Sequence, residues 1–478
     1  MSFSQLKLTL PRQNLQSSKD TVYKYKNIFL NQLANAEAFL AQSDSLVTNL
    51  HNLNRTSLSG DERYHLTIPV IQKYLVLLSS IRQTVPGQVA TDLNKEMGYA
   101  CKLLLRDCPP HSADEKSQFV HWALVALSEQ LRDHYEKYMS EPQGLWGEVH
   151  RVYEFGQSHR LNSFTNAPLN RTIEETYKQI LLLATAEPYR LTVKESRLLF
   201  TWLGNWAEKA TLNFQESPEL NHHFFYVDLS RNAGVLNHSQ VCNIGNDESI
   251  MAFNPLPVID RAKQHMVMIR KGNHPSKLGF GKQSDPIDGF VVLRKTIQAW
   301  TKTTSRRHER KGCNVHVELA FGLHQIHNYL RQSRKTETPV VEGTALNASE
   351  SGSCIEIPAN GEFQPRVGDV IAQRQDGEND RKIAVVRWLK RSFNTVLFGL
   401  EYIAGQAQPV AVRIRDQLAE ALLVSSAQND MLITRQGFYH NGEDIRVKLP
   451  HHDSLLKAVS GPLVGRMGGT DQFKIKRS

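Results

Sequence analysis

The clearest pattern in the sequence is the run Asn314-Val315-His316-Val317-Glu318-Leu319-Ala320-Phe321. Its large apolar side chains fall on every second residue, and the positions between them are mostly polar. Successive side chains of a β-strand point to opposite faces of a sheet, so this period of two predicts a strand with one buried face. The run therefore places a β-rich domain in the last third of the chain.

Further short strands are predicted downstream, separated by glycine and asparagine at turn positions. They are Cys354–Ile357, Val370–Ala372, Lys382–Leu389 and Val396–Ile403. Short strands with turn residues at this spacing favour a closed, antiparallel β-barrel. Four more candidates after Arg415 predict a β-rich extension, which we expect to form a second small sheet: Ala421–Val424, Met431–Thr434, Ile445–Leu449 and Phe473–Ile475.

Residues 1–215 have apolar side chains at the three-and-four spacing of amphipathic helices, as in Thr21–Leu53 and Tyr64–Val85. Residues 216–298 read as a small mixed α/β module, with strands predicted at Phe224–Leu229 and His265–Ile269 and with Ile287–Thr301 open between strand and helix. The fold class is thus multidomain α+β. The expected domains are a helical array (1–215), the mixed module (216–298), the barrel (299–415) and the extension (416–478).

Composition limits the class of protein. The chain has 478 residues, of which 40% are hydrophobic and 22% charged, and no run approaches the ~20 apolar residues of a membrane helix. The start lacks the apolar core of a signal peptide, and the five cysteines contain no Cys-x-x-Cys pair. We therefore expect a cytoplasmic protein without disulfides. The net charge of +9 suits an anionic ligand, and eight Lys or Arg against three Glu lie within residues 301–340.

Two short motifs lie at strand entries inside this β-rich region. The first is Ser305-Arg306-Arg307-His308-Glu309-Arg310, and the second is Asn347-Ala348-Ser349-Glu350-Ser351-Gly352. Arginine binds phosphates and guanine edges with a planar fork of donors. A turn of Asn, Ser and Gly brings backbone N–H groups and short polar side chains close to an anion. The two motifs predict a pocket for a small ligand that carries phosphate and guanine.

The ordered set of motifs resembles the PilZ-domain family. It consists of Arg-Arg-x-x-Arg, then Asn-x-Ser-x-x-Gly, then the strands Val385–Leu389 and Phe398–Ile403, and it spans about residues 300–405. The resemblance implies a six-stranded antiparallel barrel that binds the bacterial second messenger cyclic di-GMP. The polar insert Arg331–Gly343 lengthens the gap between the motifs, and we expect it to form a long hairpin loop.

The resemblance also implies the ligand-binding residues. Arg306, Arg307 and Arg310 would hold the phosphates and guanine edges, and Asn347, Ser349 and Gly352 would line the opposite wall. The second motif begins with Asn where the family also uses Asp. Asn keeps a hydrogen-bond acceptor and loses the charge.

We therefore expect a non-catalytic receptor or adaptor whose ligand is cyclic di-GMP. An unknown protein partner would be contacted through the helical domain, in control of motility, pili, exopolysaccharide or biofilm. Two alternatives stay open: a degenerate PilZ scaffold that binds proteins without nucleotide, and an RNA-binding protein. Nucleic acid is the less favoured ligand because the predicted strands offer few outward aromatic side chains for stacking bases.

Enzyme and metal patterns are weak. No paired carboxylates or nucleophile motif stand out, and Leu278-Gly279-Phe280-Gly281-Lys282 lacks the spacing of a phosphate loop. Three histidine groups lack a third ligand at fixed spacing, and we predict no metal. They are His222-His223 with Asp228, His324 with His327, and His451-His452-Asp453. The segment Asp228–Gly234 echoes the second motif and leaves open a degenerate barrel in the mixed module, without a ligand.

Overall fold

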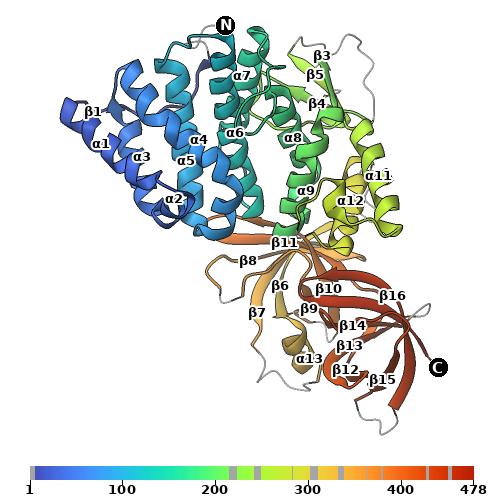
Figure 1. Cartoon of the computed structure of the whole chain (residues 1–478). Helices are drawn as coiled ribbons and strands as arrows, with labels where there is room; N and C mark the ends of the chain where they lie inside the picture. Colours follow the sequence, from blue (N-terminus) through green and yellow to red (C-terminus); the bar gives the residue numbers. More distant parts are fainter. Residues whose placement is uncertain are drawn as a thin grey trace. The chain divides into compact units, whose positions relative to one another are not determined.

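The computed structural model describes residues 6–214, 223–241, 249–282, 284–301, 310–331, 339–361, 363–377, 380–426, 430–450 and 455–477. The chain divides into two compact units (Figure 1). Unit 1 comprises residues 1–137, 141–188 and 194–303, and unit 2 comprises residues 138–140, 189–193 and 304–478. The two short segments of unit 2 lie, in sequence, between helices of unit 1.

Unit 1 is mainly helical, as the sequence predicts. Its long helices, α4 to α8, pack on one another through apolar faces that include Leu93, Trp122 and Leu181. Side-chain caps begin several helices, and Thr172 and Glu175 form a capping box at the start of α8. The helices are α1 (Lys19–Gln32), α2 (Ala36–Ala41), α3 (Ser43–Asn54), α4 (Gly60–Thr84), α5 (Gly87–Asp107), α6 (Ala113–Glu136), α7 (Leu145–Ser158), α8 (Ile173–Thr185) and α9 (Val193–Trp206). The short strands β1 (Leu15–Gln16) and β2 (Thr56–Ser57) pair in parallel.

The mixed module also belongs to unit 1. Its three-stranded sheet has the order β3-β5-β4, built from β3 (Thr211–Phe214), β5 (Ile250–Asn254) and β4 (Phe225–Asp228). The helices are α10 (His238–Val241), α11 (Leu256–Arg270) and α12 (Pro286–Thr301). The described residues of the module form no barrel.

One predicted strand of the module is wrong. His265–Ile269 lies inside α11, whose buried side chains are Val258, Ile259, Ala262, His265 and Ile269. Buried residues at this three-and-four spacing lie on one face of a helix. The five-residue run from His265 to Ile269 is too short for its apolar pattern to distinguish a helical period of 3.6 from the strand period of two.

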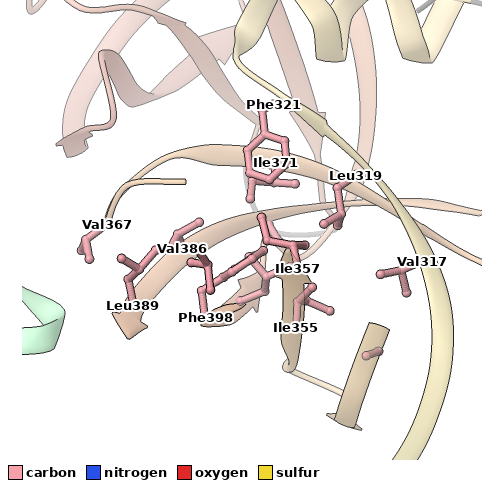
Figure 2. Close-up of a cluster of buried hydrophobic side chains, with 14 of the residues drawn as sticks. Val317, Leu319, Phe321, Ile355, Ile357, Val367, Ile371, Val386, Leu389 and Phe398 are labelled. Carbon is pink, nitrogen blue, oxygen red and sulfur yellow. The ribbon is translucent and has the colours of Figure 1, made fainter. Parts of the chain in front are cut away.

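Unit 2 contains two closed, six-stranded barrels. The first confirms the predicted architecture and has the strand order β10-β11-β8-β7-β6-β9. It consists of β6 (Lys311–Phe321), β7 (Val341–Ser349), β8 (Gly352–Pro358), β9 (Val370–Gln375), β10 (Arg381–Arg391) and β11 (Thr395–Tyr402). Figure 2 shows its interior, where Val317, Leu319 and Phe321 of the alternating run meet apolar side chains of the other strands.

Helix α13 (Leu323–Arg331) follows β6 directly, at a place where the sequence predicted no helix. Most of the expected long loop, residues 332–338, lies outside the described residues. Ile326 and Tyr329 of α13 are buried in an apolar cluster that joins the first barrel to Leu422, Val424 and Ile433 of the second.

The β-rich extension is also a closed barrel, of order β12-β13-β14-β17-β16-β15. All four strands predicted there are present, and two further strands, β12 and β16, complete the ring. The strands are β12 (Gln406–Ile414), β13 (Gln417–Ser425), β14 (Asp430–Arg435), β15 (Asp444–Lys448), β16 (Leu455–Met467) and β17 (Thr470–Arg477). We predicted the extension to begin at residue 416, and the first strand of the second barrel begins at Gln406. If the six strands of each barrel are numbered one to six in chain order, each strand has the same two neighbouring strands in both rings. The second barrel therefore repeats the topology of the first.

Candidate ligand-binding site

The outer face of the first barrel carries a row of five residues that crosses five strands, with short side chains everywhere except at Trp388. The row runs through directly paired residues, which share one face of the sheet. They are Gly312 of β6, Asn347 of β7, Cys354 of β8, Gly399 of β11 and Trp388 of β10. Since neighbouring strands lie about 4.8 Å apart, Asn347 and Trp388 are separated by roughly 14 Å of sheet.

Arg310 stands at the Asn347 end of the row. Its Nη1 donates a hydrogen bond to Asn347 Oδ1 at 3.3 Å, so the two sequence motifs meet in the folded chain. Arg310 and Asn347 are both half-buried. Arg306 and Arg307, which precede Arg310 in the sequence, lie outside the described residues.

The Asn-x-Ser-x-x-Gly motif forms the hairpin between β7 and β8. Ser349 is paired with Gly352 across the hairpin, and its Oγ donates to the Gly352 carbonyl at 3.2 Å. A Cβ added to Gly352 would lie 2.0 Å from the Leu400 carbonyl oxygen. Gly352 therefore allows the close approach of β8 and β11, which is a packing role that the sequence did not predict.

Cys354 lies at the centre of the row and is buried. Burial raises the pKa of its thiol, and the guanidinium of Arg310 partly opposes that rise. The thiol therefore stays neutral at neutral pH and adds no negative charge where an anion would bind. Arg310 therefore lies beside a face whose neighbouring side chains are uncharged.

Trp388 closes the other end of the row and was not predicted as a site residue. A Cβ added to Gly399 would lie 1.9 Å from the Trp388 Nε1, so the indole lies directly over this glycine. Beside it, Arg387 donates to Glu401 across the same strand pair. The signal was present in the sequence as Trp388 and Gly399 on two predicted strands, but only their pairing places the ring on the glycine.

The other candidate residues have structural contacts. Asp228 Oδ1 accepts from the Ser230 amide at 3.0 Å, and Asn232 Oδ1 accepts from the Gly147 amide of α7 at 3.0 Å, so this segment is a strand-to-turn junction. His324 Nδ1 lies 2.7 Å from Glu420 Oε2, and the buried His327 lies near the same carboxylate. Within the part of the chain that the structure describes, no group of three His, Cys, Asp or Glu could hold a metal ion. His222 and His451–Asp453 lie outside that part.

The closed barrel and its arginine-bounded outer face define a PilZ-type domain. Comparison with family models agrees: residues 330–409 match the middle PilZ domain of the cyclic-di-GMP receptor FimW, and residues 27–218 match the N-terminal domain of the same receptor. The two matches together cover more than half of the chain. The chain belongs to this family of cyclic-di-GMP receptors. No curated protein matches it. None of the described helices has both the length and the apolar character needed to cross a membrane.

Proposed function

We propose that this chain binds cyclic di-GMP on the outer face of the first barrel and relays binding to a protein partner without catalysing a reaction. The observation that carries the proposal is the row from Asn347 to Trp388, with Arg310 bonded to Asn347 at one end and an indole over Gly399 at the other. Between these two groups the row has only the short side chains of Asn347, Cys354 and Gly399, and we propose that a flat base lies along this part of the sheet.

Each end of the row suits one part of the ligand. The Arg310 guanidinium can donate two parallel hydrogen bonds to a phosphate or to the O6 and N7 atoms of guanine. The Trp388 ring offers a flat apolar surface for stacking a purine, an interaction worth about 1–3 kcal/mol per base. Arg306 and Arg307 precede Arg310 by a few residues, and we assign them the remaining phosphate and guanine contacts.

The Asn347 amide has a positioning role in this proposal. Its Oδ1 accepts from Arg310 and fixes the guanidinium beside the face, while its Nδ2 can donate to the ligand. Ser349 holds the hairpin through the Gly352 carbonyl, and its hydroxyl lies on the same side as Asn347.

The helical domain is the proposed partner surface. The N-terminal family match at residues 27–218 covers most of it and is separate from the PilZ match, so the family combines a receptor domain with a dedicated helical domain. We infer that the helical domain contacts a cytoplasmic protein that acts in pili, motility or biofilm control.

Isothermal titration calorimetry with cyclic di-GMP tests the site. We expect Arg310→Ala to weaken binding by about 1.5–3 kcal/mol, the scale of a charge-assisted hydrogen bond, or roughly ten- to a hundred-fold. Asn347→Ala should weaken binding less, and the double variant should lose less than the sum because Asn347 acts partly through Arg310. Arg413→Ala, which removes the same charge from the second barrel, is the matched control.

The outcomes separate the alternatives. If the wild type binds cyclic di-GMP and the Arg310→Ala and Arg306→Ala variants bind it with the same affinity, the proposed binding site is wrong. Absence of binding by the wild type favours the degenerate scaffold. Affinity for polyribonucleotides that falls steeply with salt, without affinity for cyclic dinucleotides, favours the RNA-binding alternative.

A further inference from the structure

The second barrel repeats the strand order of the first but lacks its ligand motifs. Residues 403–405, which precede β12, contain no arginine, and the connection from β13 to β14 reads Ser426-Ala427-Gln428-Asn429. The chain therefore keeps a second PilZ-type topology without the groups that would bind a cyclic dinucleotide there. Its outer face has a different set of side chains.

Three cations lie directly opposite one another on that outer face. Arg413 of β12 pairs with Arg446 of β15, and Arg446 pairs with Lys457 of β16. All three side chains are exposed, and each lacks an ion-pair partner among the described residues. Like charges directly opposite in an antiparallel sheet destabilise it, so this row (the cationic row) works against the barrel that carries it.

The charges around the row do not neutralise it. Lys448 and Lys476 extend the basic face to the next ladder positions, opposite Leu455 and Val459. Two carboxylates share the face, Asp444 and Glu420, and Glu420 is paired with His324 at 2.7 Å. Five cations and two carboxylates therefore share the outer face of five neighbouring strands, β13, β12, β15, β16 and β17.

Two leucines flank the cationic row and are unusually exposed for large apolar side chains. Leu418 pairs with Arg413 at one end of the row and is 67% exposed, and Leu455 pairs with Lys448 and is 51% exposed. Of the described aromatic side chains of the second barrel, Phe438 and Phe473 are buried in the interior and Tyr439 is half-buried against the same core. The exposed face is thus cationic and aliphatic.

We propose that this face of the second barrel docks on an anionic lipid surface. Phosphate headgroups would neutralise the cationic row and relieve its internal repulsion, while Leu418 and Leu455 would reach the boundary between headgroups and acyl chains. Single-stranded nucleic acid fits less well, because its binding surfaces rely on aromatic side chains that stack bases. The receptor would then be held at the membrane surface by a face separate from the cyclic di-GMP site.

Vesicle co-sedimentation of the full chain tests the proposal, with vesicles of phosphatidylcholine alone or mixed with phosphatidylglycerol. We expect binding to the mixed vesicles only. Each lysine or arginine near an anionic surface contributes about a five-fold increase in affinity, so Arg413→Gln/Arg446→Gln/Lys457→Gln together should weaken binding roughly a hundred-fold. Lys24→Gln/Lys26→Gln/Lys277→Gln, which changes the net charge equally at exposed positions of unit 1, should bind as the wild type does.

A single substitution separates lipid binding from loss of folding. Arg446→Glu converts two like-charge pairs into opposite-charge pairs, so it should slow amide hydrogen exchange in β12, β15 and β16 while it weakens vesicle binding. Leu418→Ser/Leu455→Ser should abolish the part of vesicle binding that persists at high salt.

Three results would overturn the proposal. They are no binding of the wild type to anionic vesicles, equal binding by the triple variant and its control, and binding to duplex or single-stranded oligonucleotides in place of vesicles. Calorimetry with cyclic di-GMP accompanies each variant. The affinity of each variant for cyclic di-GMP should equal that of the wild type. A failure of lipid docking can therefore be distinguished from a failure of the proposed receptor function.

Discussion

Replacing Gly352 with Ala is the most direct test of why the second motif ends in glycine. The new methyl group would lie 2.0 Å from the Leu400 carbonyl oxygen and 3.4 Å from the Glu401 Cα. The first distance is far below ordinary contact, and the obstacle is backbone of β11, which is paired along its length with β8. We therefore expect β8 and β11 to separate at this end of the barrel.

The size of the effect follows from two opposing terms. Overpacking against an unyielding neighbour costs about 3 kcal/mol, the upper end of the usual range. Alanine also restricts the unfolded chain, which stabilises the folded state by roughly 0.4–1 kcal/mol. The net destabilisation should be about 2 kcal/mol. At Gly361, where the nearest atom to an added Cβ is 3.7 Å away, the same substitution should be neutral or slightly stabilising.

Hydrogen exchange measured by mass spectrometry resolves the effect locally, which a single melting curve of a chain with two compact units cannot do. Amides of β8 and β11 should exchange roughly thirty-fold faster in Gly352→Ala, and those of β13 and β14 should not change. Unchanged exchange in β8 and β11, or an equal increase in Gly361→Ala, would refute the packing role of Gly352.

Two further predictions concern Trp388 and His150. Trp388→Ala should weaken cyclic di-GMP binding by about 1–3 kcal/mol in calorimetry and Trp388→Phe by less, since the smaller ring still stacks; equal affinity in both would exclude stacking. Burial lowers the pKa of His150 to about 4, below its unfolded value of about 6.5. Between these two pH values the unfolded state binds a proton that the folded state does not. The free energy of unfolding should therefore fall by up to about 3 kcal/mol as the pH drops from 6.5 towards 4. His150→Gln should flatten this dependence in calorimetric melting curves, and an unaltered slope would assign it to other groups.

Local sequence patterns predicted the elements whose side chains repeat with a clear period. The alternation from Val315 to Phe321 predicted β6 because every second side chain must enter the barrel core. The three-and-four spacing of apolar residues in Tyr64–Val85 likewise predicted a helix there, and α4 spans Gly60–Thr84. The short run His265–Ile269 is the exception, since five residues do not distinguish a buried helix from a strand.

The second barrel illustrates a limit of the sequence. Its strands β12 and β16 have mixed composition, and Pro409 lies inside β12. Each forms a hairpin with the strand that follows it, but the ring closes only because β12 also pairs with β15, which lies much further along the chain. The extension was therefore predicted as β-rich, while its closure and its likeness to the first barrel followed only from the pairing.

The sequence by itself predicted the class of ligand, because Arg310 and the Asn347–Gly352 motif carry their chemistry in residue type and order. Only the tertiary structure decided which side chains lie together in the candidate site. Asn347, Cys354, Gly399 and Trp388 come from four strands, and they form one row because of the register between those strands. Register is set by long-range pairing and by which face is buried, so a shift of one residue would turn each of these side chains to the other face of the sheet.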